Sequence, residues 1–187
     1  MSSIVLSGDT SGTITVAAPA VAGTNTATLP AATGTVMVTG NMPAFYAYNS
    51  AGQSVSPSTN TKAQLNTKSS TNNATAFDTH GYFDNVTNYR YTPLIAGYYL
   101  FAAGIFGTAT SAVNVQTFIY KNGSQIAYGL SGVQANVNAN PNCSAVVYMN
   151  GTTDYVELWG QVGGGSSNSF NGGVAGTYLS GAMIRAA

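Results

Sequence analysis

Short stretches in which apolar and polar side chains alternate run through most of the chain, separated by clusters of Gly, Asn and Ser. Alternation with a period of two residues is typical of β-strands, and no segment carries the period of a helix. From residue 43 onward the pattern predicts strands at 45–48, 62–67, 89–92, 97–106, 113–120, 125–128, 144–149, 155–161 and 177–184. Short strands at this spacing indicate two packed sheets, so we expect an all-β jelly-roll sandwich of about nine to ten strands.

Two local patterns are more specific. Segment 95–106 is apolar on both faces, so we expect the sandwich core to cover one face and a neighbouring subunit to cover the other. Asn122-Gly123 stands between two alternating runs. This dipeptide predicts a tight β-hairpin, because both of its residues tolerate a positive φ.

The first 42 residues have a different texture, rich in Ala, Thr, Gly and Val. Gly12-Thr13, Gly23-Thr24 and Gly34-Thr35 recur at a fixed period of 11 residues, which is typical of stacked units. We expect short strands at 13–16, 24–29 and 35–38. Such strands bury too little apolar area to fold alone, so partner chains are needed; a disordered low-complexity tail is the alternative. Residues 1–42 are thus an attachment arm or short β-shaft, and 43–187 the head domain.

Composition narrows the class of protein. Only 5% of the residues are charged while 44% are hydrophobic, and the formal net charge is zero. We therefore expect an oligomer, and no nucleic-acid partner, because no basic surface is available to bind phosphates. We also expect that the protein does not insert into a membrane. We expect it to be synthesised without a signal peptide. The single cysteine, Cys143, is predicted to be a buried small hydrophobe.

The side chains that could carry catalysis are few. The one histidine, His80, could act only with Asp78 or Asp84, and no Gly-x-Ser-x-Gly motif is present. Asp154 and Glu157 are expected to point to opposite faces of a strand, which disfavours a carboxylate pair. The spacing of His, Cys and acidic residues matches neither a zinc site nor a calcium loop. We predict no enzymatic activity, no metal and no cofactor.

Aromatic and amide side chains remain as candidates for binding. Aromatic residues on strands favour the core and subunit interfaces: Tyr98, Tyr99, Phe101, Tyr155, Trp159 and Tyr178. Three polar loops, 69–75, 132–142 and 163–173, suit uncharged glycans, with simple solvated connections as the alternative. Their candidate receptor-facing residues are Asn72, Asn73, Asn136, Asn138, Asn140, Asn168 and Asn171.

Residues 77–84 and 89–101, which end in Gly97-Tyr98-Tyr99-Leu100-Phe101, resemble the signature of the jelly-roll family of complement globular heads and tumour-necrosis-factor-like domains. Segments 120–123, 154–159 and 178–184 resemble that family's central hairpin, the strand after its Gly-Asp turn and its closing strand. The resemblance implies a compact homotrimer with aromatic-rich faces around a threefold axis, chain termini at one end and variable loops at the other. It also implies an axial calcium ion as an option, with Asp78, Asp84 or Asp154 as its ligand.

Segments 6–13 and 27–36 are similar to parts of tailed-bacteriophage fibre and virion proteins. This similarity implies a virion protein released by lysis: a trimeric fibre or spike whose head attaches to host-surface glycans and whose residues 1–42 bind other virion proteins. A capsid decoration or head-fibre protein is the first alternative. A polysaccharide hydrolase on a jelly-roll scaffold is the second.

Overall fold

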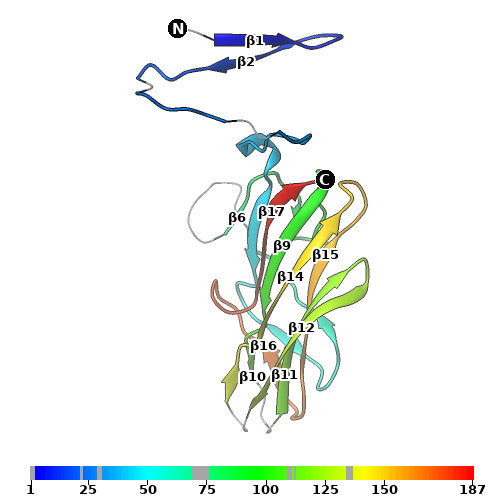
Figure 1. Cartoon of the computed structure of the whole chain (residues 1–187). Helices are drawn as coiled ribbons and strands as arrows, with labels where there is room; N and C mark the ends of the chain where they lie inside the picture. The colour runs from blue at the N-terminus through cyan, green and yellow to red at the C-terminus, as the bar shows by residue number, and fades with distance from the viewer. Residues whose placement is uncertain are drawn as a thin grey trace. The chain divides into compact units, whose positions relative to one another are not determined.

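The computed structural model describes residues 3–21, 23–28, 31–68, 76–108, 111, 113–133 and 137–187 (Figure 1). It divides into two compact units, Met1–Gly34 and Thr35–Ala187. The second unit, the head, begins before the expected boundary at residue 43 because the preceding segment already packs on it. Met37 lies against the hydrophobic core, and the Nε2 atom of His80 lies 3.1 Å from the Gly40 carbonyl oxygen.

The head is a jelly-roll sandwich, as the sequence predicts, and the strand pairs among its described residues are antiparallel. One layer is a five-stranded sheet in the order β14 (Asn142–Met149), β9 (Gly97–Gly104), β17 (Tyr178–Ala186), β3 (Ala44–Tyr48) and β6 (Phe77–Asp78). The other layer has the order β12 (Ser124–Val133), β11 (Val113–Lys121), β15 (Val156–Val162), β8 (Arg90–Tyr91) and β7 (Phe83–Asp84), with β5 (Thr61–Lys62) also paired to β15.

A small third sheet closes one end of the sandwich (Figure 1). Its order is β13 (Asn138–Ala139), β10 (Gly107–Thr108), β16 (Asn168–Phe170) and β4 (Gln53–Val55). A 3-10 turn, η1 (Thr39–Asn41), precedes β3. In the part of the chain that the structure describes, no helix is long and apolar enough to cross a membrane.

The core lies between the two large sheets and is rich in aromatic rings. Phe45 stacks on Tyr91 with ring centroids 4.0 Å apart, and Phe101 meets Tyr91 edge-on at 6.0 Å. Offset and edge-on pairs are the arrangements that the charge distribution of aromatic rings favours. Along strands such as β3 and β9 these buried positions alternate with less buried ones, which gives the sequence its period of two.

The predicted hairpin is confirmed. Asn122 and Gly123 have φ values of 50° and 79°, the left-handed pair that a two-residue hairpin turn requires. The strands that the turn joins, β11 and β12, are longer than the alternation indicates, and a bulge between Ile119 and Tyr120 shifts their register. The bulge lies next to the turn, and beyond it the pairing runs in one register from Ile119–Ala127 to Val113–Val133, so β12 extends past the expected end at residue 128.

The strand expected at 62–67 is wrong beyond its first residue. Ala63 donates its amide to the Leu158 carbonyl in one layer, while Thr67 pairs with Tyr48 in the other. Ala63 and Leu65 are both fully buried. The segment therefore crosses between the sheets, and its apolar residues fill the core without forming a ladder.

The first unit contains one hairpin, β1 (Ser3–Ser7) with β2 (Thr13–Ala17), so the strand expected at 13–16 is confirmed. Residues 24–28 and 35–38 are not strands, which corrects the prediction for the second and third repeats; Leu29 lies outside the described residues. At 35–38 the side chain of Asn41, and not a neighbouring strand, forms hydrogen bonds with the backbone. It accepts from Val38 N at 2.7 Å and donates to the Val36 carbonyl at 3.2 Å.

Candidate functional site: an uncovered apolar face

Strand β9 separates a buried face from an exposed one. Tyr99, Phe101 and Ala103 are fully buried in the core, whereas Tyr98 and Leu100 are 39% and 44% exposed. The expectation that the sandwich covers one face of this apolar segment is confirmed. Its other face carries large apolar side chains that a single chain leaves in water.

The exposed face continues across the neighbouring strands. The register places Val146 and Ala182 on either side of Leu100, and Tyr148 beside Tyr98. We call the exposed residues Tyr98, Leu100, Val146, Tyr148 and Ile184 the outer apolar face. A contiguous apolar patch on a sheet indicates a surface that another molecule covers.

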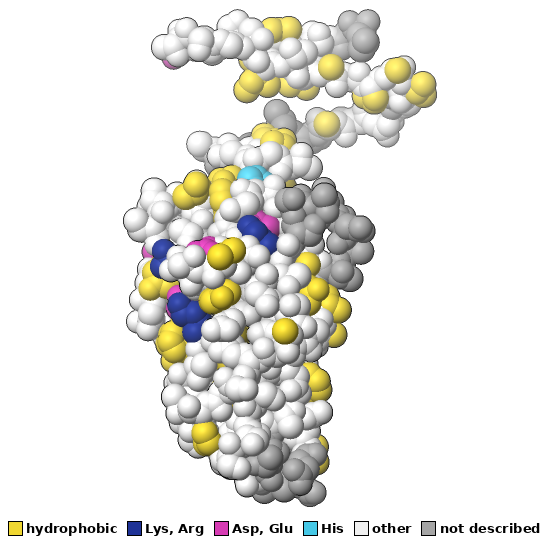
Figure 2. Space-filling view, turned by 180° about the vertical axis from the view of Figure 1, so that it is seen from behind, with side chains coloured by type: hydrophobic (Ala, Val, Ile, Leu, Met, Phe, Trp, Pro, Cys, Tyr) yellow, Lys and Arg dark blue, Asp and Glu magenta, His cyan; other side chains and the backbone are white. Residues whose placement is uncertain are grey.

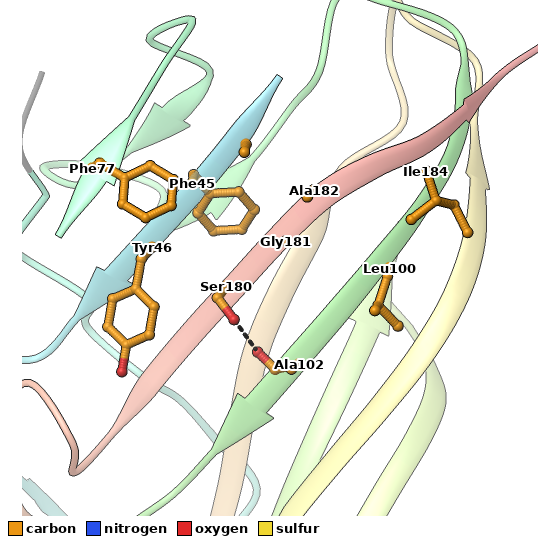
Figure 3. A pocket seen from close by; sticks show the side chains of 10 residues that line it. Phe45, Tyr46, Phe77, Leu100, Ala102, Ser180, Gly181, Ala182 and Ile184 are labelled. Carbon is orange, nitrogen blue, oxygen red and sulfur yellow. Dashed lines mark hydrogen bonds between the residues drawn. The ribbon is translucent and has the colours of Figure 1, made fainter. Parts of the chain in front are cut away.

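A shallow hollow of about 340 Å³ lies on the same side of the sheet (Figure 3). Its floor is made of small side chains, including Ala102, Ser180 and Ala182, and the Ser180 hydroxyl donates to the Ala102 carbonyl at 3.3 Å. Figure 3 shows Tyr46 and Phe77 on one side of this floor and Leu100 and Ile184 on the other. Small residues between large ones create a concavity that an apolar side chain can fill.

The rim of the hollow is held by two tyrosines. The rings of Tyr46 and Tyr178 stack with centroids 5.3 Å apart and an interplanar angle of 8°. The Tyr46 hydroxyl donates to the Val174 carbonyl at 2.5 Å, and the Tyr178 hydroxyl donates to Asn142 Oδ1 at 3.0 Å. Burial, with the Tyr178 hydroxyl nearby, raises the pKa of Tyr46 to about 12. The rim is therefore ordered by its own hydrogen bonds.

A second apolar surface lies on the edge strand β12, where Ile126, Tyr128 and Leu130 face solvent. We call these three residues the β12 strip. Strand β12 lies close to β14, since a side chain at Gly129 would collide with the Asn142 carbonyl. The molecule thus carries an apolar edge and an apolar hollow in different places.

The acidic residues considered for catalysis or metal binding hold the main chain and pair with lysines. Asp78 accepts from the backbone amides of Tyr82 and Phe83 and from Lys68 Nζ. Glu157 pairs with Lys62 at 2.6 Å. Among the described residues no three His, Cys, Asp or Glu side chains are placed to hold a metal ion. Figure 2 shows that the charged side chains visible from that side gather in one part of the head.

Asp84 and Asp154 are likewise bound within turns. Hydrogen bonds from the backbone amides of Thr87 and Val86, with others from Asn88, hold the pKa of Asp84 well below its usual range. Burial opposes ionisation of Asp154, but hydrogen bonds from Lys121, Asn122 and Asn150 outweigh it and lower its pKa. Both carboxylates are therefore anions that organise local structure.

The predicted aromatic positions fall in three places. Tyr99 and Phe101 are in the core, and Tyr98 and Tyr178 border the face just described. Trp159 and Tyr155 belong to the other side of the sandwich. Trp159 stacks on Tyr120 at 5.1 Å, and the Arg90 guanidinium lies 4.4 Å from the Tyr155 ring.

The predicted receptor-facing asparagines are only partly at the surface. Asn138 and Asn140 are exposed and Asn171 is half-buried. Asn168 is 4% exposed and donates to the carbonyls of Val162 and Gly164, so the prediction that it faces a receptor is wrong. Its amide satisfies the backbone of the preceding turn instead. Asn72, Asn73 and Asn136 lie outside the described residues.

Alanines and a serine were the site residues that the sequence analysis missed. Ala44, Ala102 and Ala182 form part of the hollow together with Ser180. Each of them is next in sequence to a side chain that is buried in the core (Phe45, Phe101, Leu179 or Met183), so the alternation of faces along a strand puts it on the outer face.

Comparisons with known proteins identify the fold. Neither protein-family models nor curated protein sequences give a match. Among solved structures, murine APRIL at pH 5.0 aligns with a TM-score of 0.56 and 7% identity over 76% of this chain and 99% of that one. The globular domain of zebrafish complement 1qA protein gives 0.54 and 13% over 78% and 98%. The Eiger TNF of S. frugiperda gives 0.54 and 8% over 78% and 93%.

These similarities confirm the expected likeness to complement heads and tumour-necrosis-factor-like domains at the level of the fold. The similarity of the N-terminal segment to bacteriophage fibre proteins stays a prediction. The head has a jelly-roll fold similar to that of the tumour-necrosis-factor and complement structures.

Proposed function

We propose that the chain is a non-enzymatic protein that assembles as a homotrimer through its five-stranded sheet. The observation that carries this proposal is the outer apolar face, which includes Leu100, 44% exposed on β9 between β14 and β17. Leaving such a surface in water is unfavourable by roughly 25 cal/mol for each Å² of apolar area. Association of like chains removes it from water.

Two different apolar surfaces on one chain favour a ring. In such a ring the β12 strip of one copy packs against the hollow of the next copy, so that every strip and every hollow is covered. Repeating this contact gives a closed ring when the rotation between neighbouring copies is cyclic. The strip consists of large exposed aliphatic and aromatic side chains, while the hollow has a floor of small side chains. The likeness of the fold to tumour-necrosis-factor and complement heads supports three as the number of copies.

Light scattering on the full chain tests this assembly. The wild type is expected at three times the chain mass, and Leu100→Lys is expected at the mass of a monomer because it puts a charge into the buried face. Val86→Lys is the matched control, since Val86 is also exposed but lies in the Asp84 turn. A monomeric wild type, or a Leu100→Lys variant that stays trimeric, would contradict the proposal.

The finer role that we propose is the head of a fibre or spike on a virion, released by lysis. The end of the head that carries Asn138 and Asn140 would bind a host-surface glycan, and the N-terminal residues would bind other virion proteins. Exposed Asn138 and Asn140 support a glycan contact, because amide groups offer hydrogen bonds to uncharged hydroxyls. The near absence of charge agrees with a neutral ligand.

Binding to host cells tests this role. Asn138→Ala with Asn140→Ala is expected to abolish binding of the purified trimer to host cells while its mass is unchanged. Unaltered binding would refute the proposal that Asn138 and Asn140 contact a glycan. Antibody labelling of virions decides the location: tail labelling agrees with the proposal, whereas labelling over the capsid supports the decoration role.

A further inference from the structure

The N-terminal hairpin separates aliphatic from polar side chains. The register pairs Ile4 with Val16 and Leu6 with Ile14, which puts these four residues on one face. We call them the aliphatic face of the hairpin. Each is 56% to 68% exposed. The opposite face carries Ser and Thr at most positions: Ser3, Val5, Ser7, Thr13, Thr15 and Ala17.

The hairpin is specified by its own turn. The Gly8 amide donates to the Gly12 carbonyl at 3.0 Å, and Gly12 has a φ of 78°, which glycine adopts without strain. A side chain at Gly8 would collide with the Ser11 carbonyl. The sequence therefore encodes the strand pairing locally, yet a lone two-stranded hairpin is only marginally stable in water. A cover for the aliphatic face would provide the missing stability.

We propose that the aliphatic face packs against the same face of the other copies in the trimer. This inference rests on the self-association proposed above. Among residues 1–61 the only charged side chain is Asp9, which lies in the turn and not on the aliphatic face. Identical faces can therefore meet without bringing like charges together, while the Ser and Thr face stays in water.

The length of the connecting chain favours copies of the same chain over a foreign partner on the aliphatic face, and the other surfaces of residues 1–42 stay free for the virion proteins proposed above. Residues 18–34 join the hairpin to the head unit, and a chain of that length reaches at most about 60 Å when fully extended. In a trimer, the effective concentration of each hairpin around the other two is therefore on the order of millimolar. A separate protein would have to compete with that concentration.

Disulfide trapping in the full chain tests the contact. In a Cys143→Ser background, Ile14→Cys places a thiol on the aliphatic face and Thr15→Cys places one on the opposite face of the same strand. Under mild oxidation of dilute trimer, Ile14→Cys is expected to form covalent dimers at least about 10-fold faster than Thr15→Cys, at a rate independent of protein concentration. Hydrogen exchange on the wild type is expected to show protected amides at Leu6 and Ile14.

The mass of each sample, measured by light scattering, separates the two hypotheses. A trimer with equal trapping rates at both positions, and unprotected hairpin amides, overturns the packing of the hairpins and leaves the proposed function intact. Trapping that scales with protein concentration also overturns it, because the contact would then join separate assemblies. A monomeric wild type overturns the proposed function itself.

Discussion

Replacing Lys68 by Met is expected to destabilise the head far more than loss of a surface ion pair would. Asp78 has a side chain that is only 2% exposed, and it accepts from Lys68 Nζ at 2.7 Å, Phe83 N at 2.8 Å and Tyr82 N at 3.1 Å. Without the lysine, this buried carboxylate keeps two backbone donors among the residues that the structure describes. The cost of leaving such a charge uncompensated is about 3–5 kcal/mol, compared with about 0–1 kcal/mol for an exposed pair.

A double-mutant cycle isolates the ion pair from other effects of the substitution. Asp78→Asn removes the charge while its amide oxygen can still accept from one backbone amide. Lys68→Met with Asp78→Asn should therefore cost less than the sum of the two single changes, by at least about 1 kcal/mol. The free energy of unfolding is measured by urea denaturation at one fixed protein concentration, because the stability of an oligomer depends on concentration.

The result that refutes this reasoning is a small effect of Lys68→Met, below about 1 kcal/mol. That outcome would mean that water reaches the carboxylate and that the pair behaves like a surface one. Lys68→Arg is the control, since it retains the positive charge and should retain most of the stability.

Four further predictions concern single residues. Gly123→Ala should cost about 1 kcal/mol in urea unfolding because φ is 79° there; a neutral change would contradict the hairpin turn. Tyr91→Phe should be neutral or stabilising, since burial raises the pKa of Tyr91 and its hydroxyl has no hydrogen-bond partner among the described residues; a loss above about 1 kcal/mol would indicate a buried water partner. The pKa of Asp84 is lower in the folded protein than in the unfolded chain, where it is near 4. Its contribution to stability is therefore complete at pH values above about 4 and is lost as the pH falls below about 4. Asp84→Asn should therefore flatten the stability profile between about pH 5 and about pH 2, and an unchanged slope would refute the role of the turn. Burial raises the pKa of Cys143 to about 11, so alkylation by iodoacetamide at neutral pH should be about 100-fold slower than for a free thiol, and a rapid reaction would show that the thiol is accessible.

The fold could be predicted from the sequence where a strand has one buried and one exposed face. Strands β9, β14 and β17 alternate in this way, and the Asn122-Gly123 turn fixes a hairpin by backbone geometry alone. The two- and three-residue strands, such as β10 and β16, are too short to show a period. The segment after Lys62 misled the prediction because burial between two layers places Ala63 and Leu65 in the core without any ladder.

The candidate site was predictable only in part, for a related reason. The doubly apolar segment 95–106 pointed to an uncovered face, and Tyr98 and Leu100 do lie there. The hollow depends on which small side chains from β3, β9 and β17 come side by side, and that register is a long-range property. Asn168 could not be distinguished from exposed asparagines because its burial depends on the backbone of the 162–164 turn.

The two ends of the head's chain leave the sandwich side by side. Met183 donates its amide to the Pro43 carbonyl, and Ala187 donates to Ala96, while β10 and β16 lie at the opposite end (Figure 1). A fluorescent protein attached after Ala187 would therefore stand next to the start of the head and leave the distal end free for ligands. A peptide epitope inserted at 163–167 would instead mark that distal end. A pair of such labels would give the polarity of the head on any larger structure in a single imaging experiment.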